Sequence, residues 1–381
     1  MNSLLLILSK KKYLGPALLF ATLNVFFGTW AIYIPAIIKR IGIDEAELGL
    51  ALLFFGLGTF IMLMAAPVLI KRLKVGKASA YGIFMLGLFF LFPFIADSYG
   101  QLCASLFLVG MAGGFTDIAI NTLVTEIEKE ESVHIMSASH GFFSLGGMLS
   151  AGIGTLFLPY VAQPFFHMLT LVVLMTIINS CLVLGYFNIS SKKIDPIPFN
   201  LKYFLPLGGL IIIGFFIMAA EGAIIDWSAL YLKKVSMAKE SFIGMGYFSF
   251  SFTMALGRFF GDGISVRYGS KKIILLGCIT AVVGFGAVLM VRPLFAITGF
   301  GLVGLGFSVI VPELFRIGGK MKNINSAEGI SLISGSGFLG FLVGPVLLGY
   351  LAKISSLRLS MLTLLFFTLI SFLTALTLNK K

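Results

Sequence analysis

Residues 13–38 read YLGPALLFATLNVFFGTWAIYIPAII and contain no charged side chain. A helix needs about 20 apolar residues to cross the hydrocarbon core of a bilayer, so this stretch is long enough to span one. It is also longer than the apolar region of a secretory signal peptide, and it lacks an A-x-A exit. We therefore expect it to be a membrane helix and not a cleaved leader.

The same apolar character continues through the whole chain. Of 381 residues, 58% are hydrophobic and only 12% are charged, and the mean hydropathy is +1.04. A soluble protein of this length has too little polar surface at such a composition to cover its apolar side chains. Lipid removes that difficulty, because helices satisfy their own backbone hydrogen bonds there. The sequence predicts an all-α membrane protein.

Twelve such stretches follow one another with short connections. They lie near residues 13–38, 47–70, 78–96, 99–124, 136–160, 164–187, 203–232, 241–264, 272–291, 293–315, 326–350 and 357–377. The longest connection contains Lys192, Lys193, Pro196 and Pro198, and this combination of charge and proline breaks helices. We predict an N-terminal six-helix bundle over residues 1–188, a cytoplasmic linker over 189–202, and a C-terminal six-helix bundle over 203–381.

Charge places the ends of these helices. The net charge of +12 comes from short Lys and Arg clusters between apolar runs, so it indicates topology and no nucleic-acid partner. Twelve spans put both termini on one side, and that side carries more than twice as many Lys and Arg residues as the other. The positive-inside rule predicts a multi-pass protein of the bacterial inner membrane with both termini in the cytoplasm. Cys103, Cys181 and Cys278 lie inside apolar runs, which argues against a disulfide framework.

The two halves repeat each other at one constant shift. Gly28 matches Gly222 (222 − 28 = 194), and Gly146 matches Gly340 at the same shift. Further matches are Gly141 with Gly335, residues 108–110 with 302–304, and the basic pairs 39–40 with 233–234. A repeat of six spans preserves orientation, so the halves are related by an axis along the membrane normal.

Loops between helices two and three and between helices eight and nine carry basic clusters. The first has Lys71, Arg72, Lys74, Gly76 and Lys77 without an Asp, whereas the second keeps Gly257, Arg258, Asp262, Arg267 and Gly269. These clusters resemble the G-x-x-x-D-R-x-G-R-R signature of the major facilitator superfamily. We expect Arg258, Asp262 and Arg267 to form a conformational latch, since Arg258 and Asp262 have i,i+4 spacing; the alternative is a solvated cluster that only sets topology.

Three intramembrane segments resemble a narrower branch of that superfamily, the fucose permease-like sugar:proton symporters. They are Asp117-Ile-Ala-Ile-Asn121, His140-Gly-Phe-Phe-Ser144, and Glu221-Gly with Asp226-Trp227-Ser228. The resemblance implies that Asp117 matches the carboxylate that binds substrate or proton, with Asn121, His140 and Trp227 lining the cavity. Helix one departs from the branch, because it has Asn24 and Trp30 but no acid. The proton site has then moved, for example to Glu221, or coupling differs.

Two carboxylates, Asp117 and Glu221, lie inside predicted membrane spans, where charge is energetically costly. A charge at mid-bilayer costs about 2.5–3.5 kcal/mol even on the lenient insertion scale. Asp117 and Glu221 are therefore expected to face an aqueous cavity and to exchange protons, the alternative being structural carboxylates bonded to neighbouring side chains. His140 is either a proton relay or a hydrogen-bonded cavity wall. Trp30 and Trp227 either stack on a sugar or belong to an interfacial belt.

These features predict secondary active transport of a small polar organic solute, such as a sugar or sugar derivative, by alternating access. The expected substrate- and proton-binding residues are Asp117, Asn121, Glu221, His140, Trp227, Asn24, Trp30 and Ser144. The alternative is an efflux transporter for a drug or metabolite. No catalytic or metal-binding motif supports an enzyme. We expect a monomer in the lipid bilayer that uses a proton gradient and no cofactor or metal.

Overall fold

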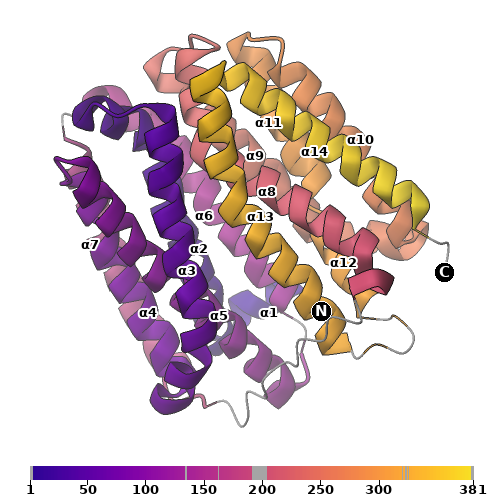
Figure 1. The fold of residues 1–381 in the computed structure, drawn as a ribbon. Helices are drawn as coiled ribbons and strands as arrows, with labels where there is room; N and C mark the ends of the chain where they lie inside the picture. Colours follow the sequence, from indigo (N-terminus) through magenta and orange to yellow (C-terminus); the bar gives the residue numbers. More distant parts are fainter. Residues whose placement is uncertain are drawn as a thin grey trace. The chain divides into compact units, whose positions relative to one another are not determined.

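The computed structural model describes residues 3–133, 135–161, 163–190, 204–319, 321, 324 and 326–378. All regular elements among these residues are helices, which confirms the all-α prediction (Figure 1). The α-helices are α1 (Ser3–Ser9), α2 (Lys11–Ile41), α3 (Glu45–Leu73), α4 (Val75–Phe90), α5 (Tyr99–Glu131), α6 (Met136–Phe157), α7 (Pro164–Leu182), α8 (Phe204–Lys234), α9 (Met245–Tyr268), α10 (Ser270–Val288), α11 (Pro293–Phe307), α12 (Ile310–Gly318), α13 (Ser326–Ile354) and α14 (Leu357–Thr377). Short 3-10 turns lie at Phe92–Phe94 (η1), Leu158–Tyr160 (η2), Val183–Gly185 (η3) and Glu240–Phe242 (η5).

Eleven segments of the described chain are long and apolar enough to cross a membrane. Helix α9 occupies the remaining predicted span, near 241–264. One predicted span differs, because residues 293–315 are divided between α11 and α12, with a break at Ser308 and Val309. Pro312 explains the break, since it lacks the N–H that would bond the Ser308 carbonyl and its ring crowds that carbonyl.

The chain forms two compact units. Unit 1 comprises Met1–Ile43 and Leu50–Ile194, and unit 2 comprises Asp44–Gly49 and Asp195–Lys381. Helix α3 therefore begins in unit 2 and continues in unit 1 from Leu50. The predicted linker, residues 189–202, lies outside the described residues except for Ile189 and Ser190.

Matching glycine contacts confirm the internal repeat. In unit 1, a Cβ on Gly146 of α6 would lie 2.0 Å from the carbonyl oxygen of Ala21 in α2. In unit 2, a Cβ on Gly340 of α13 would lie 2.2 Å from the carbonyl oxygen of Phe215 in α8. Both the glycines and their partners are 194 residues apart (340 − 146 and 215 − 21). Only glycine permits such close approach of two helix backbones.

The two units cap the end of their third span with different side chains. In unit 1, Arg40 donates to the carbonyl oxygens of Phe94 at 2.6 Å, Pro93 at 3.0 Å and Ala96 at 2.9 Å. In unit 2, the Tyr231 hydroxyl donates to the carbonyl of Val288 at 2.9 Å. Val288 is the repeat mate of Phe94 (288 − 94 = 194). Each helix end thus has a partner for a carbonyl that the helix itself leaves unbonded.

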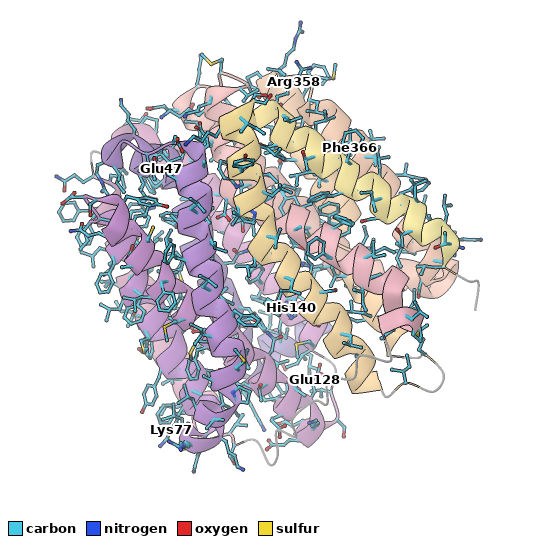
Figure 2. The ribbon with its side chains drawn as sticks, viewed as in Figure 1. Glu47, Lys77, Glu128, His140, Arg358 and Phe366 are labelled. Atoms are coloured by element: carbon cyan, nitrogen blue, oxygen red, sulfur yellow. The ribbon has the colours of Figure 1, made fainter. Side chains whose placement is uncertain are left out.

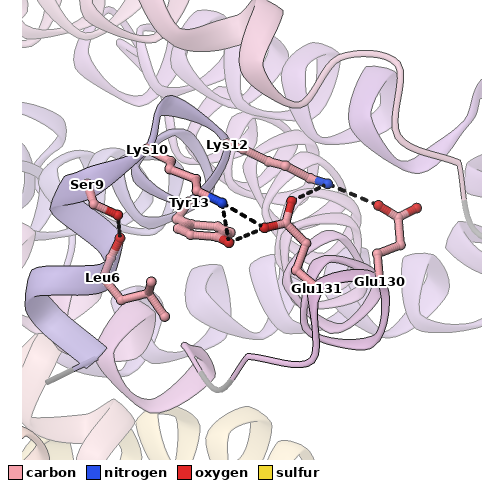
Figure 3. A network of polar contacts seen from close by, with 7 residues as sticks. All are labelled: Leu6, Ser9, Lys10, Lys12, Tyr13, Glu130 and Glu131. Atoms are coloured by element: carbon pink, nitrogen blue, oxygen red, sulfur yellow. Dashed lines mark hydrogen bonds and ion pairs between the residues drawn. The ribbon is translucent and has the colours of Figure 1, made fainter. Parts of the chain in front are cut away.

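An ionic network joins the beginning of α2 to the end of α5 in unit 1 (Figure 3). Lys12 lies 2.8 Å from Glu131 and 3.1 Å from Glu130, and Lys10 lies 3.2 Å from Glu131. Tyr13 donates its hydroxyl hydrogen to Glu131. The acidic run at the end of α5 is therefore partly paired rather than only solvated.

Glu128, labelled in Figure 2, caps the next helix. Its Oε1 accepts hydrogen bonds from the backbone N–H groups of Ile135, at 2.5 Å, and Met136, at 2.8 Å. A carboxylate at this position satisfies unbonded donors and favours the positive end of the α6 dipole. This capping fixes where α6 begins, four residues before His140.

A reciprocal capping box starts α3 on the unit 2 side. Asp44 accepts from the backbone N–H groups of Ala46 and Glu47 at 2.9 Å, and Glu47 accepts from that of Asp44 at 2.9 Å. This is the arrangement in which two unbonded donors are satisfied at once. The backbone bond from Glu47, followed by the ion pair with Lys353 at 2.9 Å, holds the pKa of Asp44 below its usual value. Lys234 lies 2.6 Å from Glu45 in the same unit.

We predict that Gly146→Ala and Gly340→Ala each lower the melting temperature of the detergent-solubilised protein. The added methyl group would meet a backbone oxygen, which cannot rotate away, and overpacking of this kind costs about 1–3 kcal/mol. Trp30 and Trp227 are the two tryptophans, and both are buried, so intrinsic fluorescence reports unfolding. Gly335→Ala in α13 is the matched control, because nothing lies within 4 Å of its added Cβ. Equal melting temperatures for Gly335→Ala and Gly340→Ala would contradict the prediction.

Candidate functional site

A polar chain of three residues lies inside unit 1. Asn121 Nδ2 donates to the carboxylate Oδ1 of Asp117 at 3.2 Å and to its backbone carbonyl at 2.9 Å. Asn121 Oδ1 lies 3.1 Å from Nε2 of His140. Asp117 and Asn121 have i,i+4 spacing on α5, which places them on one helix face, while α6 supplies His140. The structure therefore brings together three of the predicted site residues.

Hydrogen-bond chemistry fixes the polarity of this chain. The amide N–H₂ of Asn121 faces the acceptors of Asp117, so its oxygen faces His140. An amide oxygen only accepts, so His140 donates from a protonated Nε2. Asn121 is therefore the intermediary between a carboxylate and an imidazole, the two side-chain types that most often exchange protons in proteins.

The aromatic ring of Phe20 packs against the imidazole of His140. The ring centroids of Phe20 on α2 and His140, labelled in Figure 2, lie 4.6 Å apart with an interplanar angle of 39°. Asp117, Asn121 and His140 are half-buried. The site thus combines ionisable groups with partial exposure inside spans that are otherwise apolar.

The other predicted residues of unit 1 lie in its core. Asn24 is 1% exposed and donates to the Phe143 carbonyl at 2.9 Å, which links α2 to α6. Ser144 is 2% exposed. Trp30 is buried and packs edge-on to Phe94, with centroids 6.4 Å apart. Asn24 and Trp30 therefore contribute to packing within unit 1.

Unit 2 contains an intramembrane ion pair. Arg258 Nη2 on α9 lies 3.3 Å from Glu221 Oε1 on α8, and their side chains remain 15% and 12% exposed. The structure pairs Arg258 with Glu221, whereas the sequence placed Arg258 in a latch with Asp262 and Arg267. The side chains of Asp262 and Arg267 lie outside the described part of the chain, so the rest of the latch stays a prediction. A guanidinium within a span requires a counter-charge, and Glu221 supplies it.

Trp227 and Ser228 follow Glu221 on α8. Both are 0% exposed, and neither Nε1 of Trp227 nor Oγ of Ser228 has a hydrogen-bond partner among the described residues. An unsatisfied buried polar group costs about 1–3 kcal/mol, so such groups usually have a reason. A solute reaches Trp227 only if the surrounding helices separate.

The polar residues do not follow the internal repeat. At a shift of 194, Asp117, Asn121 and His140 correspond to Val311, Phe315 and Ser334, whereas Glu221 and Arg258 correspond to Phe27 and Met64. Glycine contacts that build the fold are shared by both units, but these ionisable groups are not. The fold therefore does not require them.

Two features were accessible to sequence reasoning to different degrees. Glu313 and Arg316 on α12 are three residues apart, a spacing at which a helix brings two side chains together, and they form an ion pair at 2.9 Å. The pair Glu221 and Arg258 was missed because its members lie 37 residues apart. The available signal was the position of Arg258 within an apolar stretch. Among the described residues no group of three or more His, Cys, Asp or Glu side chains is arranged to hold a metal ion.

Comparison with known proteins gives consistent results. The family model of the Major Facilitator Superfamily matches residues 17–321. An uncharacterized MFS-type transporter of Yersinia pestis is 32% identical over 332 residues, 86% of this chain and 85% of that protein. The uncharacterized transporter y4wD of Sinorhizobium fredii is 28% identical over 91% of this chain and 92% of its own length. The membrane protein MosC of Rhizobium meliloti is 26% identical over 87% of this chain and 81% of its own.

Solved structures share the fold at low sequence identity. The nucleoside transporter NupG superposes with a TM-score of 0.73 at 13% identity, covering 100% of both chains. A bacterial homologue of the lysosomal transporter Spinster, in an inward-facing and unoccupied conformation, superposes with a TM-score of 0.71 at 14% identity, covering 96% of both.

We predict strong energetic coupling between Glu221 and Arg258. Removing one partner of a buried ion pair leaves an uncompensated charge, which costs about 3–5 kcal/mol. Glu221→Gln and Arg258→Gln should each lower the melting temperature, and the double variant should recover most of the loss. A double-mutant cycle by fluorescence melting measures this, and additive losses would show that the two side chains do not interact.

Proposed function

Because the chain belongs to the major facilitator superfamily, we propose that it is a proton-coupled transporter of a small polar organic solute. The solute is a sugar or sugar derivative, in keeping with the resemblance of helices four, five and seven to the fucose permease-like branch. The membrane is the bacterial inner membrane, with both termini in the cytoplasm, as the distribution of Lys and Arg indicates. Transport proceeds by alternating access, the mode of operation of this fold.

One observation carries this proposal, namely the hydrogen-bonded chain Asp117–Asn121–His140 within the spans of unit 1. An ionisable residue inside a membrane span is expensive and is functional by default. A carboxyl group linked through an amide to an imidazole can take up and release a proton while its partners stay hydrogen-bonded. The repeat-related positions of unit 2 lack these three residues, which supports a functional role for them rather than a role in maintaining the fold.

Charge conservation explains how a proton couples to movement. With Asp117 ionised, the hydrogen-bonded group Asp117–Asn121–His140 carries a negative charge that needs water or a polar solute beside it. With Asp117 protonated, this group of three residues is neutral, and closing apolar helices around it costs less free energy. A proton and a solute that bind together therefore shift the populations of the two access states, as differential binding requires.

We predict that a transported solute acidifies the lumen of proteoliposomes containing a trapped pH-sensitive dye. The probes are fucose, galactose, glucosamine and glucuronate, each added with the pH gradient in both orientations to separate uptake from efflux. Asp117→Asn should abolish solute-driven proton movement, and His140→Gln should slow it about tenfold or more, in the range that general acid–base groups contribute.

Asp97→Asn is the matched control, because this substitution is the same and Asp97 is exposed in the connection before α5. It should behave like the unaltered protein. The proposal fails if proton movement persists unchanged in both Asp117→Asn and His140→Gln, or if no probe moves protons in either orientation.

A further inference from the structure

The ion pair of unit 2 has the properties of an exchangeable contact. Arg258 and Glu221 meet through one nitrogen–oxygen separation of 3.3 Å, whereas charge-assisted N–H···O⁻ bonds are usually about 2.7–2.9 Å long. Each side chain keeps part of its surface exposed. A long, partly exposed contact is one that a second carboxylate can replace.

The ionisable side chains on the helices around α8 show which cation pairs with Glu221. The other ionisable side chains described on helices that pack against α8 are Tyr247 and Tyr268 on α9, Glu313 and Arg316 on α12, Tyr350 and Lys353 on α13, and Arg358 on α14. Arg316 bonds Glu313 at 2.9 Å, and Lys353 bonds Asp44 at 2.9 Å. Among the described residues, Arg258 is the cation that forms an ion pair with Glu221.

A second observation lies on the same helix face. Ser228 is seven residues beyond Glu221, which is two turns and about 10 Å along α8. Its fully buried hydroxyl has no partner among the described residues. When the helices around α8 separate, as they must to admit a solute, a cation and an unsatisfied hydroxyl two turns apart suit a solute with a carboxylate at one end and a hydroxyl group at the other.

We propose that Arg258 binds the carboxylate of a hydroxylated organic acid, that Glu221 is the counter-ion which this carboxylate displaces, and that Ser228 bonds a hydroxyl group of the same solute. This inference rests on the proposed transport function and narrows its substrate class from polar solutes to hydroxy acids, including sugar acids.

Charge balance links the exchange to a proton. Arg258 stays protonated, since a guanidinium does not lose its proton in proteins. When the solute carboxylate bonds Arg258, the displaced Glu221 would be an unpaired negative charge in an apolar span. It therefore takes up one proton from water, so one carboxylate and one proton enter together and the net charge of unit 2 is unchanged.

Matched pairs of probes test the inference in purified protein. D-gluconate and D-glucitol differ mainly in a carboxylate, as do D-galactonate and galactitol. By titration calorimetry, each acid should bind at least tenfold more tightly than its neutral mate, and its affinity should rise between pH 8 and pH 6. Arg258→Gln should remove this preference, and Ser228→Ala should weaken gluconate binding several-fold.

Glu221→Gln mimics the protonated counter-ion, so it should bind gluconate at least tenfold more tightly at pH 8 and lose the pH dependence. Arg316→Gln is the control and should keep the preference for acids. Should a single variant fail to fold, the neutral pair Glu221→Gln with Arg258→Gln replaces it, and it should bind no acid preferentially.

Acids that bind no better than their neutral mates overturn the inference, as does a preference that survives Arg258→Gln. Either result leaves the transport proposal standing if neutral sugars still drive proton movement that depends on Asp117. Loss of that Asp117-dependent movement, with acid binding intact, instead removes the transport proposal.

Discussion

The dominant constraint on this molecule is the cost of placing charge in an apolar solvent. This chain has 58% hydrophobic residues and 12% charged residues, so few ionisable groups lie inside its spans. Among the described residues, three of the carboxylates are paired or hydrogen-bonded, as an apolar solvent requires. Glu221 bonds Arg258, Glu313 bonds Arg316, and Asp117 bonds an amide that reaches His140.

Symmetry separates fold from function in this chain. Contacts that set the approach of helices, such as Gly146 on Ala21 and Gly340 on Phe215, recur in both units at one shift. The capping of the third span recurs as well, although Arg40 performs it in unit 1 and Tyr231 in unit 2. The ionisable groups of the two candidate sites do not recur, so unit 1 has the Asp117–Asn121–His140 hydrogen bonds and unit 2 the Glu221–Arg258 ion pair. Two units with the same scaffold thus carry different chemistry.

Sequence reasoning succeeded where the deciding forces are local. Apolar length predicted the spans, and constant spacing predicted the repeat. It failed at the Glu221–Arg258 pair, because which helices adjoin is decided by packing across the unit and not by nearby residues. The break between α11 and α12 could have been predicted from Pro312. Hydropathy alone did not reveal it, because the whole stretch is apolar. The burial of Trp227 was also out of reach, because a tryptophan near a helix end reads equally as a belt residue.

The central claim is that water reaches the ionisable groups of the spans. It is tested most directly by thiol accessibility in a variant whose Cys103, Cys181 and Cys278 are replaced by serine. Asn121→Cys and Arg258→Cys, each in lipid vesicles, are exposed to a membrane-impermeant thiol reagent, with Ala119→Cys on the fully buried side of α5 as the reference. The account predicts that positions 121 and 258 react at least tenfold faster than position 119. Equal, negligible labelling at all three positions would contradict it.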